Sequence, residues 1–464
     1  MDIKVVFNTK EIDCDILIVN QFEGELTSEE VANRYAIEKD GFKGKFGQTY
    51  LLQTYDKLPA SKILVIGFGK KEEFNNDKLR EAVAKSVKKA MQMNAKTIAF
   101  SLDNLGYDYS EHFTYGVLIA DYAFDKYKSE KVDKIETVYV QANAEVVNRT
   151  IKIAEAMSFA RDLINEPAQI VTPQYLADIA ESLDIDCRVY NRDEIERMGM
   201  GAFAAVAKGS IHPPKFIHLR YTCENPVKRI AIVGKGITFD SGGMDLKPAA
   251  SMLTMKDDMS GAACVLATMK AITALNPNIE VHGLIAACEN MINGCAYKPG
   301  DILRAKNGKT IEIDNTDAEG RLTLADALCY ACELGVDEVI DIATLTGACM
   351  VALGTQAAGI MGNNDGFVKK LIATANSAGE RFWELPMWDD YGTSLKSSIA
   401  DMKNTGSRYG GASTAGVFLK KFVTNPCWAH IDIAGVAYME KAQREFIEGG
   451  TGAGVRTLVK YIAG

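Results

Sequence analysis

The sequence predicts two α/β domains: a small N-terminal α/β domain and a larger C-terminal α/β domain with a mixed central sheet. Short apolar runs typical of buried strands alternate with stretches of helical periodicity along most of the chain. This alternation indicates sheets that are largely parallel and covered by helices. The chain has 464 residues, too many for one ordinary core, and a proline-containing turn interrupts it near residue 170.

The N-terminal domain is assigned to residues 1–145. Its expected strands are short and rich in Ile and Val, and a stretch with helical spacing lies among them. The strands are residues 15–20, 62–69, 96–102 and 136–143, and the helix is residues 76–94. The glycines of VIGFGK lack the GxGxxG spacing of a nucleotide-binding turn, so a simple turn at a strand end is the favoured interpretation.

A helix over residues 143–165 is expected to join the two halves. It ends before Pro167 and Pro173, which prevent helical continuation. The linker helix and its proline-containing turn are assigned to residues 146–173, and the C-terminal domain to residues 174–464. The strands expected in this domain are residues 216–222, 228–234, 280–288, 338–345 and 428–435.

Composition excludes several classes of protein. The net charge of −9 disfavours nucleic-acid binding, which needs a basic surface. The uncharged stretch 342–364 is long enough to cross a bilayer, but it is rich in Gly, Ala and Thr, so a buried strand–helix unit is expected instead. The N-terminal residues lack the pattern of a signal peptide, and ten cysteines show no pairing pattern, so we expect a cytoplasmic protein without a membrane partner. Cys329 and Cys332 lie in an expected helix and are interpreted as core residues.

Three segments place charged side chains at strand ends or helix starts, where α/β sheets gather ligands. VGKGITFDSGGMDLKP contains Lys235, Asp240, Asp245 and Lys247; MKDDMSGAA contains Asp257 and Asp258; NTDAEGRL contains Asp317, Glu319 and Arg321. Each segment alone is most simply a turn or a helix cap. HExxH is absent, which excludes a histidine-based zinc protease, and the absence of GxSxG weakens a serine hydrolase interpretation.

Convergence of the carboxylates would require cations. The side chains concerned are Asp240, Asp258, Asp317 and Glu319. Two like charges about 4 Å apart repel by roughly 4 kcal/mol at an effective dielectric of about 20. Two divalent ions would neutralise four carboxylates; oxygen ligands suit Mg²⁺ and Mn²⁺, and Zn²⁺ also accepts them. Such a site activates water for hydrolysis, and Lys247 and Arg321 would then stabilise an oxyanion and anchor an anion. Spacing alone leaves this convergence open.

These segments resemble the motifs of the leucine aminopeptidase family. NTDAEGRL looks like the signature octapeptide of that family, and VGKGITFDSGG, MKDDMSGAA, NEPAQIVTP and WAHIDIAG also fit it. The match extends over about residues 155–460, whereas the N-terminal part resembles the family in its α/β layout, for which a macro-like domain is expected. The resemblance implies a metallopeptidase that releases N-terminal residues from peptides by means of a water activated by two metal ions.

The resemblance also implies a role for each site residue. The implied metal ligands are Lys235, Asp240, Asp258, Asp317 and Glu319. Asp240 and Glu319 would bridge two ions, Asp317 would complete one site, and Lys235 and Asp258 would complete the other. The ions are expected to be Mn²⁺ or Zn²⁺, with Mg²⁺ or Co²⁺ also compatible.

Catalytic and substrate-binding roles follow from the same resemblance. Lys247 would polarise the scissile carbonyl, and Arg321 would hold a bicarbonate-like anion that relays protons. Met255, Thr344 and Gly347 would line the pocket for the first side chain, which is expected to be Leu or Met. The expected substrates are peptides with a free N-terminus, and the expected assembly is a homohexamer.

Two residues depart from the family pattern. Asp245 stands where many relatives have Ser or Asn, and our hypothesis is that its extra negative charge raises metal affinity or shifts metal preference. Gln169 replaces a common Asn. The alternatives left open are a Cys-Gly dipeptidase or DNA-binding role, a two-metal phosphoesterase, and ADP-ribose binding by the N-terminal domain. The charge balance disfavours the DNA-binding role, and the lack of histidine in these segments disfavours the phosphoesterase.

Overall fold

The computed structural model describes the whole chain except residues 26–36, 38–39, 56, 103–104 and 106–107. Contacts divide the chain into two compact units. The first consists of Met1–Glu155 and Lys441–Ile447, and the second of Ala156–Glu440 and Glu448–Gly464. Each unit contains a sheet and helices, which confirms the prediction of two α/β domains.

The first unit is built on a six-stranded sheet with the order β1-β6-β5-β2-β4-β3. The strands are β1 (Asp2–Val5), β2 (Ile16–Phe22), β3 (Thr49–Gln53), β4 (Lys62–Gly69), β5 (Thr97–Ser101) and β6 (Thr137–Val140). All neighbours pair in parallel except β3 and β4. Helices α2 (Asn76–Gln92) and α3 (Ser110–Asp121) belong to the same unit. The four predicted strands and the predicted helix of this part are all present.

Helix α4 (Ala144–Asn165) matches the helix expected over residues 143–165. The border between the two units falls inside it, after Glu155. Pro173 does not only end a helical stretch: it occupies the first turn of α5 (Pro173–Glu181), whose N-cap is Thr172. Proline is tolerated there because the N–H that it lacks would have no intrahelical partner. The linker boundaries 146–173 stay a prediction.

The second unit contains an eight-stranded sheet with the order β15-β14-β17-β13-β9-β10-β8-β7. Its strands are β7 (Asp186–Tyr190), β8 (Lys215–Tyr221), β9 (Arg229–Asp240), β10 (Glu280–Asn290), β13 (Glu338–Ala343), β14 (Ala358–Gly362), β15 (Phe382–Glu384) and β17 (Cys427–Asp432). The central strands β10, β9, β13 and β17 pair in parallel, whereas β8 and β14 pair antiparallel with their inner neighbours. The sheet is therefore mixed, as predicted.

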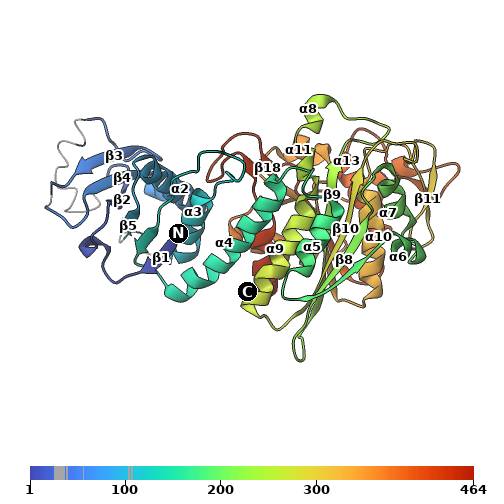
Figure 1. Ribbon diagram of the computed structural model, residues 1–464, viewed down its shortest axis with the longest axis horizontal. Coiled ribbons are helices and arrows are strands. Elements are labelled where there is room, and N and C mark those ends of the chain that lie inside the picture. Colours follow the sequence, from blue (N-terminus) through green and yellow to red (C-terminus); the bar gives the residue numbers. More distant parts are fainter. Residues whose placement is uncertain (26–36, 38–39, 56, 103–104, 106–107) are drawn as a thin grey trace. The chain divides into compact units, whose positions relative to one another are not determined.

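Helices cover both faces of this sheet, and Figure 1 shows α9 and α10 on opposite sides of it. Besides α5, the second unit contains α6 (Arg192–Arg197), α7 (Gly201–Val206), α8 (Ala249–Met252), α9 (Ser260–Leu275), α10 (Gly320–Glu333), α11 (Gly347–Leu353), α12 (Asp365–Ala378), α13 (Gly411–Lys420) and α14 (Val455–Ala463). Small additional sheets are formed by β11 (Ile302–Arg304), β12 (Thr310–Glu312) and β16 (Met402–Lys403), and by β18 (Tyr438–Met439) and β19 (Gly449–Gly450).

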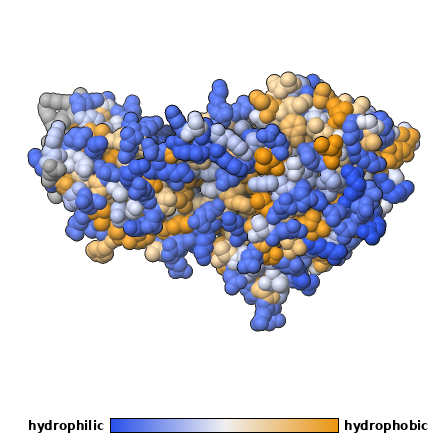
Figure 2. Space-filling model, in the orientation of Figure 1, coloured by the Kyte–Doolittle hydropathy of each residue, from blue (hydrophilic) through white to orange (hydrophobic). Residues whose placement is uncertain are grey.

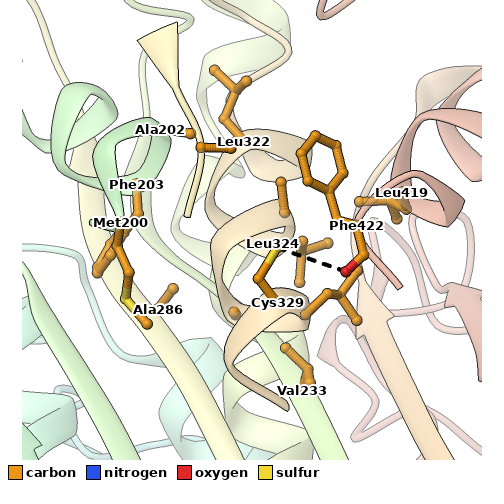
Figure 3. Close-up of a cluster of buried hydrophobic side chains, with 14 of the residues drawn as sticks. Met200, Ala202, Phe203, Val233, Ala286, Leu322, Leu324, Cys329, Leu419 and Phe422 are labelled. Carbon is orange, nitrogen blue, oxygen red and sulfur yellow. Dashed lines mark hydrogen bonds between the residues drawn. The ribbon is translucent and has the colours of Figure 1, made fainter. Parts of the chain in front are cut away.

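A large cluster of buried apolar side chains packs α10 against the sheet. Figure 3 shows Leu324 of α10 facing Phe422, and Cys329 donating a hydrogen bond to the Phe422 carbonyl with an Sγ···O distance of 3.7 Å. Cys329 is thus a buried core residue as expected, while Cys332 is half-buried and all ten cysteines are free. Because this packing holds α10 in place, it also fixes the turn that precedes α10.

Two long uncharged or apolar stretches belong to the body of the second unit. Residues 342–364 form the end of β13, helix α11 and strand β14, so a strand–helix unit is present as expected. The expectation that the whole unit is buried was wrong for the helix, because Cys349 is the one buried residue of α11. The stretch Met255–Leu275 is long and apolar enough to cross a membrane, but 78% of its most apolar window is buried inside the protein. Core packing accounts for its composition.

Candidate metal centre

The candidate site lies where β9 ends and α10 begins. Strand β9 carries Lys235 and ends at Asp240, and the short helix η5 (Met255–Met259) carries Asp258. A turn after β12 leads through Asp317 and Glu319 into α10. The carboxyl ends of parallel strands meet at one edge of a sheet, which is why these separate segments come together.

Two lysines and four carboxylates form one cluster at this edge. The Nζ atom of Lys235 lies 2.7 Å from Asp258 Oδ1 and 2.9 Å from Glu319 Oε1. The Nζ atom of Lys247 lies 2.9 Å from Asp240 Oδ2 and 2.5 Å from Asp317 Oδ1. One oxygen from each of Asp240, Asp317 and Glu319 lies within 4.8 Å of the other two.

Burial and mutual repulsion perturb these carboxyl groups. Burial, followed by the charge of Glu319, raises the pKa of Asp240 to about 6. Burial also raises the pKa of Asp258 and of Asp317 despite the nearby lysines. Burial acts in the same direction on Glu319, but Lys235 and Lys247 outweigh it and hold the pKa of that carboxyl below its usual value. Four carboxylates against two ammonium groups leave an excess of negative charge in a buried space.

The donor set fits divalent cations. Asp258 Oδ2 and Glu319 Oε2 are buried and have no hydrogen-bond partner in the described part of the chain. An unpaired buried carboxylate oxygen is costly, and a cation satisfies it together with the excess charge. Carboxylate oxygens with one amine nitrogen suit Mn²⁺, Zn²⁺ and related ions.

Gly320 brings the helix start close to Lys235. A Cβ atom at this position would lie 2.5 Å from Lys235 Cε and 2.7 Å from Lys235 Nζ. The Lys235 side chain therefore crosses over the first turn of α10, where only a glycine leaves room for it. This close approach brings the amine between Asp258 and Glu319.

A second layer of polar residues supports the cluster, and most of these residues were not predicted from the sequence. Thr344 Oγ1 donates to Asp258 Oδ1 at 2.9 Å, and the Thr344 carbonyl accepts from Lys235 Nζ at 3.0 Å. Asn290, the last residue of β10, donates from Nδ2 to Asp240 Oδ1 at 2.8 Å. The one available signal was its position, because a polar residue ends a fully buried strand directly beside the end of β9.

Arg321 also lies at this centre. Its Nη1 donates to the Asn404 carbonyl at 2.8 Å, while its Nε is buried without a partner among the described residues. Burial lowers the pKa of Arg321 to about 10, although Glu319 and Asp432 act in the opposite direction. The guanidinium is still charged at neutral pH and keeps one N–H available for an anion.

The three residues expected in the substrate pocket lie on two segments. Met255 begins η5, three residues before Asp258. Thr344 directly follows β13, and Gly347 is the first residue of α11. Thr344 is tied to the cluster by the hydrogen bonds described above, and a Cβ atom at Gly347 would meet nothing within 4 Å. Met255 and Thr344 are half-buried. Asp245 lies beside Thr316, outside the carboxylate cluster.

Comparison with known proteins agrees with this geometry. Residues 158–459 match the catalytic domain of the cytosol aminopeptidase family, and residues 23–131 match the N-terminal domain of the same family. The probable cytosol aminopeptidase of Aquifex aeolicus is 46% identical over 439 residues, which cover 92% of this chain and 89% of that protein. The probable cytosol aminopeptidase of Synechocystis is 42% identical over 472 residues, covering 98% of this chain and 94% of that protein.

Solved structures agree as well. A mutant of tomato leucine aminopeptidase superposes with a TM-score of 0.89 at 34% identity, covering 100% of this chain and 96% of that chain. The bottromycin maturation enzyme BotP, also solved in complex with Mn, superposes with a TM-score of 0.89 at 33% identity, covering 97% of this chain and 99% of that chain. The chain therefore belongs to the cytosol aminopeptidase family and is a metal-dependent peptidase that acts on the N-terminal residues of peptides.

Proposed function

We propose that the reaction uses two divalent ions held in the cluster at the end of β9. The proposed ligands are Lys235, Asp240, Asp258, Asp317 and Glu319. The observation that carries this proposal is the convergence of four carboxylates, two of them with buried oxygens that lack a partner among the described residues. Two ions bring four positive charges, which match the four carboxylates.

Asp240 and Glu319 are proposed to contact both ions, with Asp317 completing one site and Lys235 and Asp258 the other. Lys235 must lose its proton to act as a ligand, and binding of the ions favours that loss. When bound, the ions supply Lewis acidity and activate water at neutral pH. We propose Mn²⁺ or Zn²⁺, with Mg²⁺ or Co²⁺ also compatible; the structure of the bottromycin maturation enzyme with Mn supports the first choice.

Lys247 and Arg321 are proposed as the catalytic cations. Lys247 is the more exposed of the two clustered lysines, with 14% of its side chain accessible against 4% for Lys235. It can therefore reach a substrate and donate from Nζ to the carbonyl oxygen as negative charge develops there. Arg321 has an unused Nε–H donor, which supports a bicarbonate-like anion that accepts and returns protons beside it.

The substrate is proposed to be a peptide with a free N-terminus. Met255, Thr344 and Gly347 would line the pocket for its first side chain, for which Leu or Met is proposed. This assignment is supported by the position of Thr344, which contacts both Lys235 and Asp258 and therefore lies next to the reacting centre.

The assembly and location are proposals of the same kind. We propose a cytoplasmic homohexamer, with residues 1–145 and 174–464 as its two domains and 146–173 as their linker. The names of the relatives support the cytosol. Leu253 is 83% and Val351 90% exposed, which supports burial against another subunit. Figure 2 shows apolar atoms gathered over α8. Light scattering would measure the mass of the assembly.

A matched pair of substrates tests the proposal. Chelation should abolish cleavage of Leu-anilide, and Mn²⁺, Zn²⁺ or Co²⁺ should restore it, with two ions per chain by elemental analysis. N-acetyl-Leu-anilide should resist cleavage, and Cys-Gly in the same series measures the dipeptidase alternative. Full activity in metal-free protein, or equal rates on both anilides, would contradict the proposed mechanism.

A further inference from the structure

Thr316 is the residue through which the turn carrying Asp317 is attached to its surroundings. It is fully buried, and its carbonyl accepts hydrogen bonds from Tyr297 Oη at 2.7 Å and from Asn290 Nδ2 at 3.0 Å. Asn290 also donates to Asp240, so this side of Thr316 is connected to a second carboxylate of the cluster. Any movement of Thr316 displaces Asp317, because the two are adjacent in the chain.

The other side of Thr316 is held by Asp245. Asp245 Oδ2 accepts from the Thr316 backbone N–H at 2.8 Å and lies 3.0 Å from Thr316 Oγ1. In return, the Asp245 backbone N–H donates to Thr316 Oγ1 at 2.8 Å. The Thr316 hydroxyl has one hydrogen, and the Gly242 carbonyl, 2.7 Å away, is its nearer acceptor.

Asp245 lies on the loop that connects two other members of the cluster. This loop runs from Asp240 to Lys247 and is closed by a hydrogen bond of 2.9 Å from the Lys247 N–H to the Ser241 carbonyl. Gly242 has a φ of +89°, and a Cβ atom there would lie 2.5 Å from the Asp245 carbonyl oxygen, so the loop is as tight as its backbone allows. Asp245 thus joins the loop of Asp240 and Lys247 to the turn of Asp317.

We propose that Asp245 is a positioning residue that holds Asp317 in its metal-binding place through hydrogen bonds to Thr316. This inference rests on the proposed role of Asp317 as a ligand. It is an alternative to the hypothesis that Asp245 acts through its extra charge. Asp245 is exposed, so solvent and salt screen its field, whereas its hydrogen bonds to Thr316 are local and directional.

Two substitutions of Asp245 distinguish hydrogen bonding from charge. Asp245→Asn keeps an oxygen that can accept from the Thr316 N–H but removes the charge, whereas Asp245→Ala removes both. Mutating a residue that orients a metal ligand without touching the metal typically lowers metal affinity by about 10–100-fold. Because Asp245 is exposed, we expect an effect near the lower end of this range. We expect Asp245→Ala to weaken Mn²⁺ binding about tenfold and Asp245→Asn to stay close to the parent protein.

The measurement is the Mn²⁺ dissociation constant, obtained by competition with a chromogenic chelator at low and high salt, with the melting temperature taken on each sample. An equal loss in Asp245→Asn and Asp245→Ala that shrinks at high salt would mean that charge is what matters, and would overturn the proposal. Unchanged binding in Asp245→Ala would overturn it as well.

Two further variants keep the result decisive. If Asp245→Ala does not fold, Thr316→Val removes the hydroxyl that binds the Asp245 N–H at nearly constant volume, and it should also weaken Mn²⁺ binding; normal binding there refutes the inference. Asp317→Asn leaves the contacts of Thr316 in place but weakens the ligand itself. Normal Mn²⁺ binding in Asp317→Asn would refute the proposed ligand set. The two Asp245 variants test the positioning role instead, so the two refutations can be told apart.

Discussion

Gly320→Ala changes a single hydrogen into a methyl group at a crowded point of the metal centre. The new Cβ atom would lie 2.5 Å from Lys235 Cε, 2.7 Å from Nζ and 2.8 Å from Cδ. Contacts between carbon atoms are favourable only at about 3.5–4.0 Å, so the Lys235 side chain must move away. The Lys235 Nζ atom then loses its contacts with Asp258 Oδ1 at 2.7 Å and Glu319 Oε1 at 2.9 Å.

The effect on stability and the effect on metal binding should separate. Overpacking costs about 1–3 kcal/mol, while replacing glycine by alanine in a helix recovers about 1 kcal/mol, so we expect a net loss of about 0–2 kcal/mol. The fold should therefore survive. Metal binding should fall by at least about tenfold, because displacing a ligand affects the ion more than altering the residues behind it.

The test measures metal content, Mn²⁺ affinity, melting temperature and Leu-anilide turnover on the same preparations of the parent protein and the variants. Gly294→Ala is the matched control, because its Cβ atom would meet nothing within 4 Å and its φ is not positive. We expect Gly294→Ala to behave as the parent protein. A folded Gly320→Ala with normal metal content and turnover would refute the place we give to Lys235.

Three further changes test other parts of the structure. His218 Nε2 lies 2.8 Å from His282 Nδ1, and burial, followed by His282, lowers the pKa of His218 to about 4 from 6.5. Because the folded protein favours the neutral imidazole, folding is not penalised above about pH 6.5, and stability is lost as the pH falls toward 4. Between pH 7 and pH 5, the unfolding free energy of His218→Gln should therefore drop about 1–2 kcal/mol less than that of the parent protein. Urea denaturation measures both drops, and equal drops would contradict this. Gly347→Ala should keep its melting temperature but lower kcat/KM for Leu-anilide relative to Ala-anilide about tenfold if this residue lines the pocket, and an unchanged ratio removes it from the pocket. Arg321→Ala should keep its metals and regain part of its lost rate with added bicarbonate, and complete loss of metal would argue against an anion-binding role.

Local sequence patterns predicted the central strands of both units. Strands such as β2 and β10 are continuous buried runs, so their apolar residues stand out. Edge strands were missed for the opposite reason: β3 and β7 consist mostly of exposed and half-buried residues, and β1 has four residues. Their pairing partners stabilise them, and that information is not local.

The carboxylates of the site could be proposed from the sequence because they follow strands or precede helices. The residues that support them could not be predicted from the sequence. Asn290 contacts Asp240 because β10 and β9 pair in a register that places the two side by side, and Thr316 binds Asp245 across 71 positions of sequence. The role of Lys235 as a ligand came from resemblance, since spacing gives no reason for a lysine to lose its proton.

Metal content and rate measured together in Lys247→Ala and Glu319→Ala test the central claim most directly. Glu319 is proposed to contact both ions, so Glu319→Ala should lose metal and rate together. Lys247 is proposed to act on the substrate oxygen, and an interaction made mainly in the transition state lowers the rate without emptying the site. Lys247→Ala should therefore keep two ions and its fold while losing about 10²–10³ in kcat. Near-normal turnover in Lys247→Ala, or metal loss equal to that of Glu319→Ala, would contradict the account.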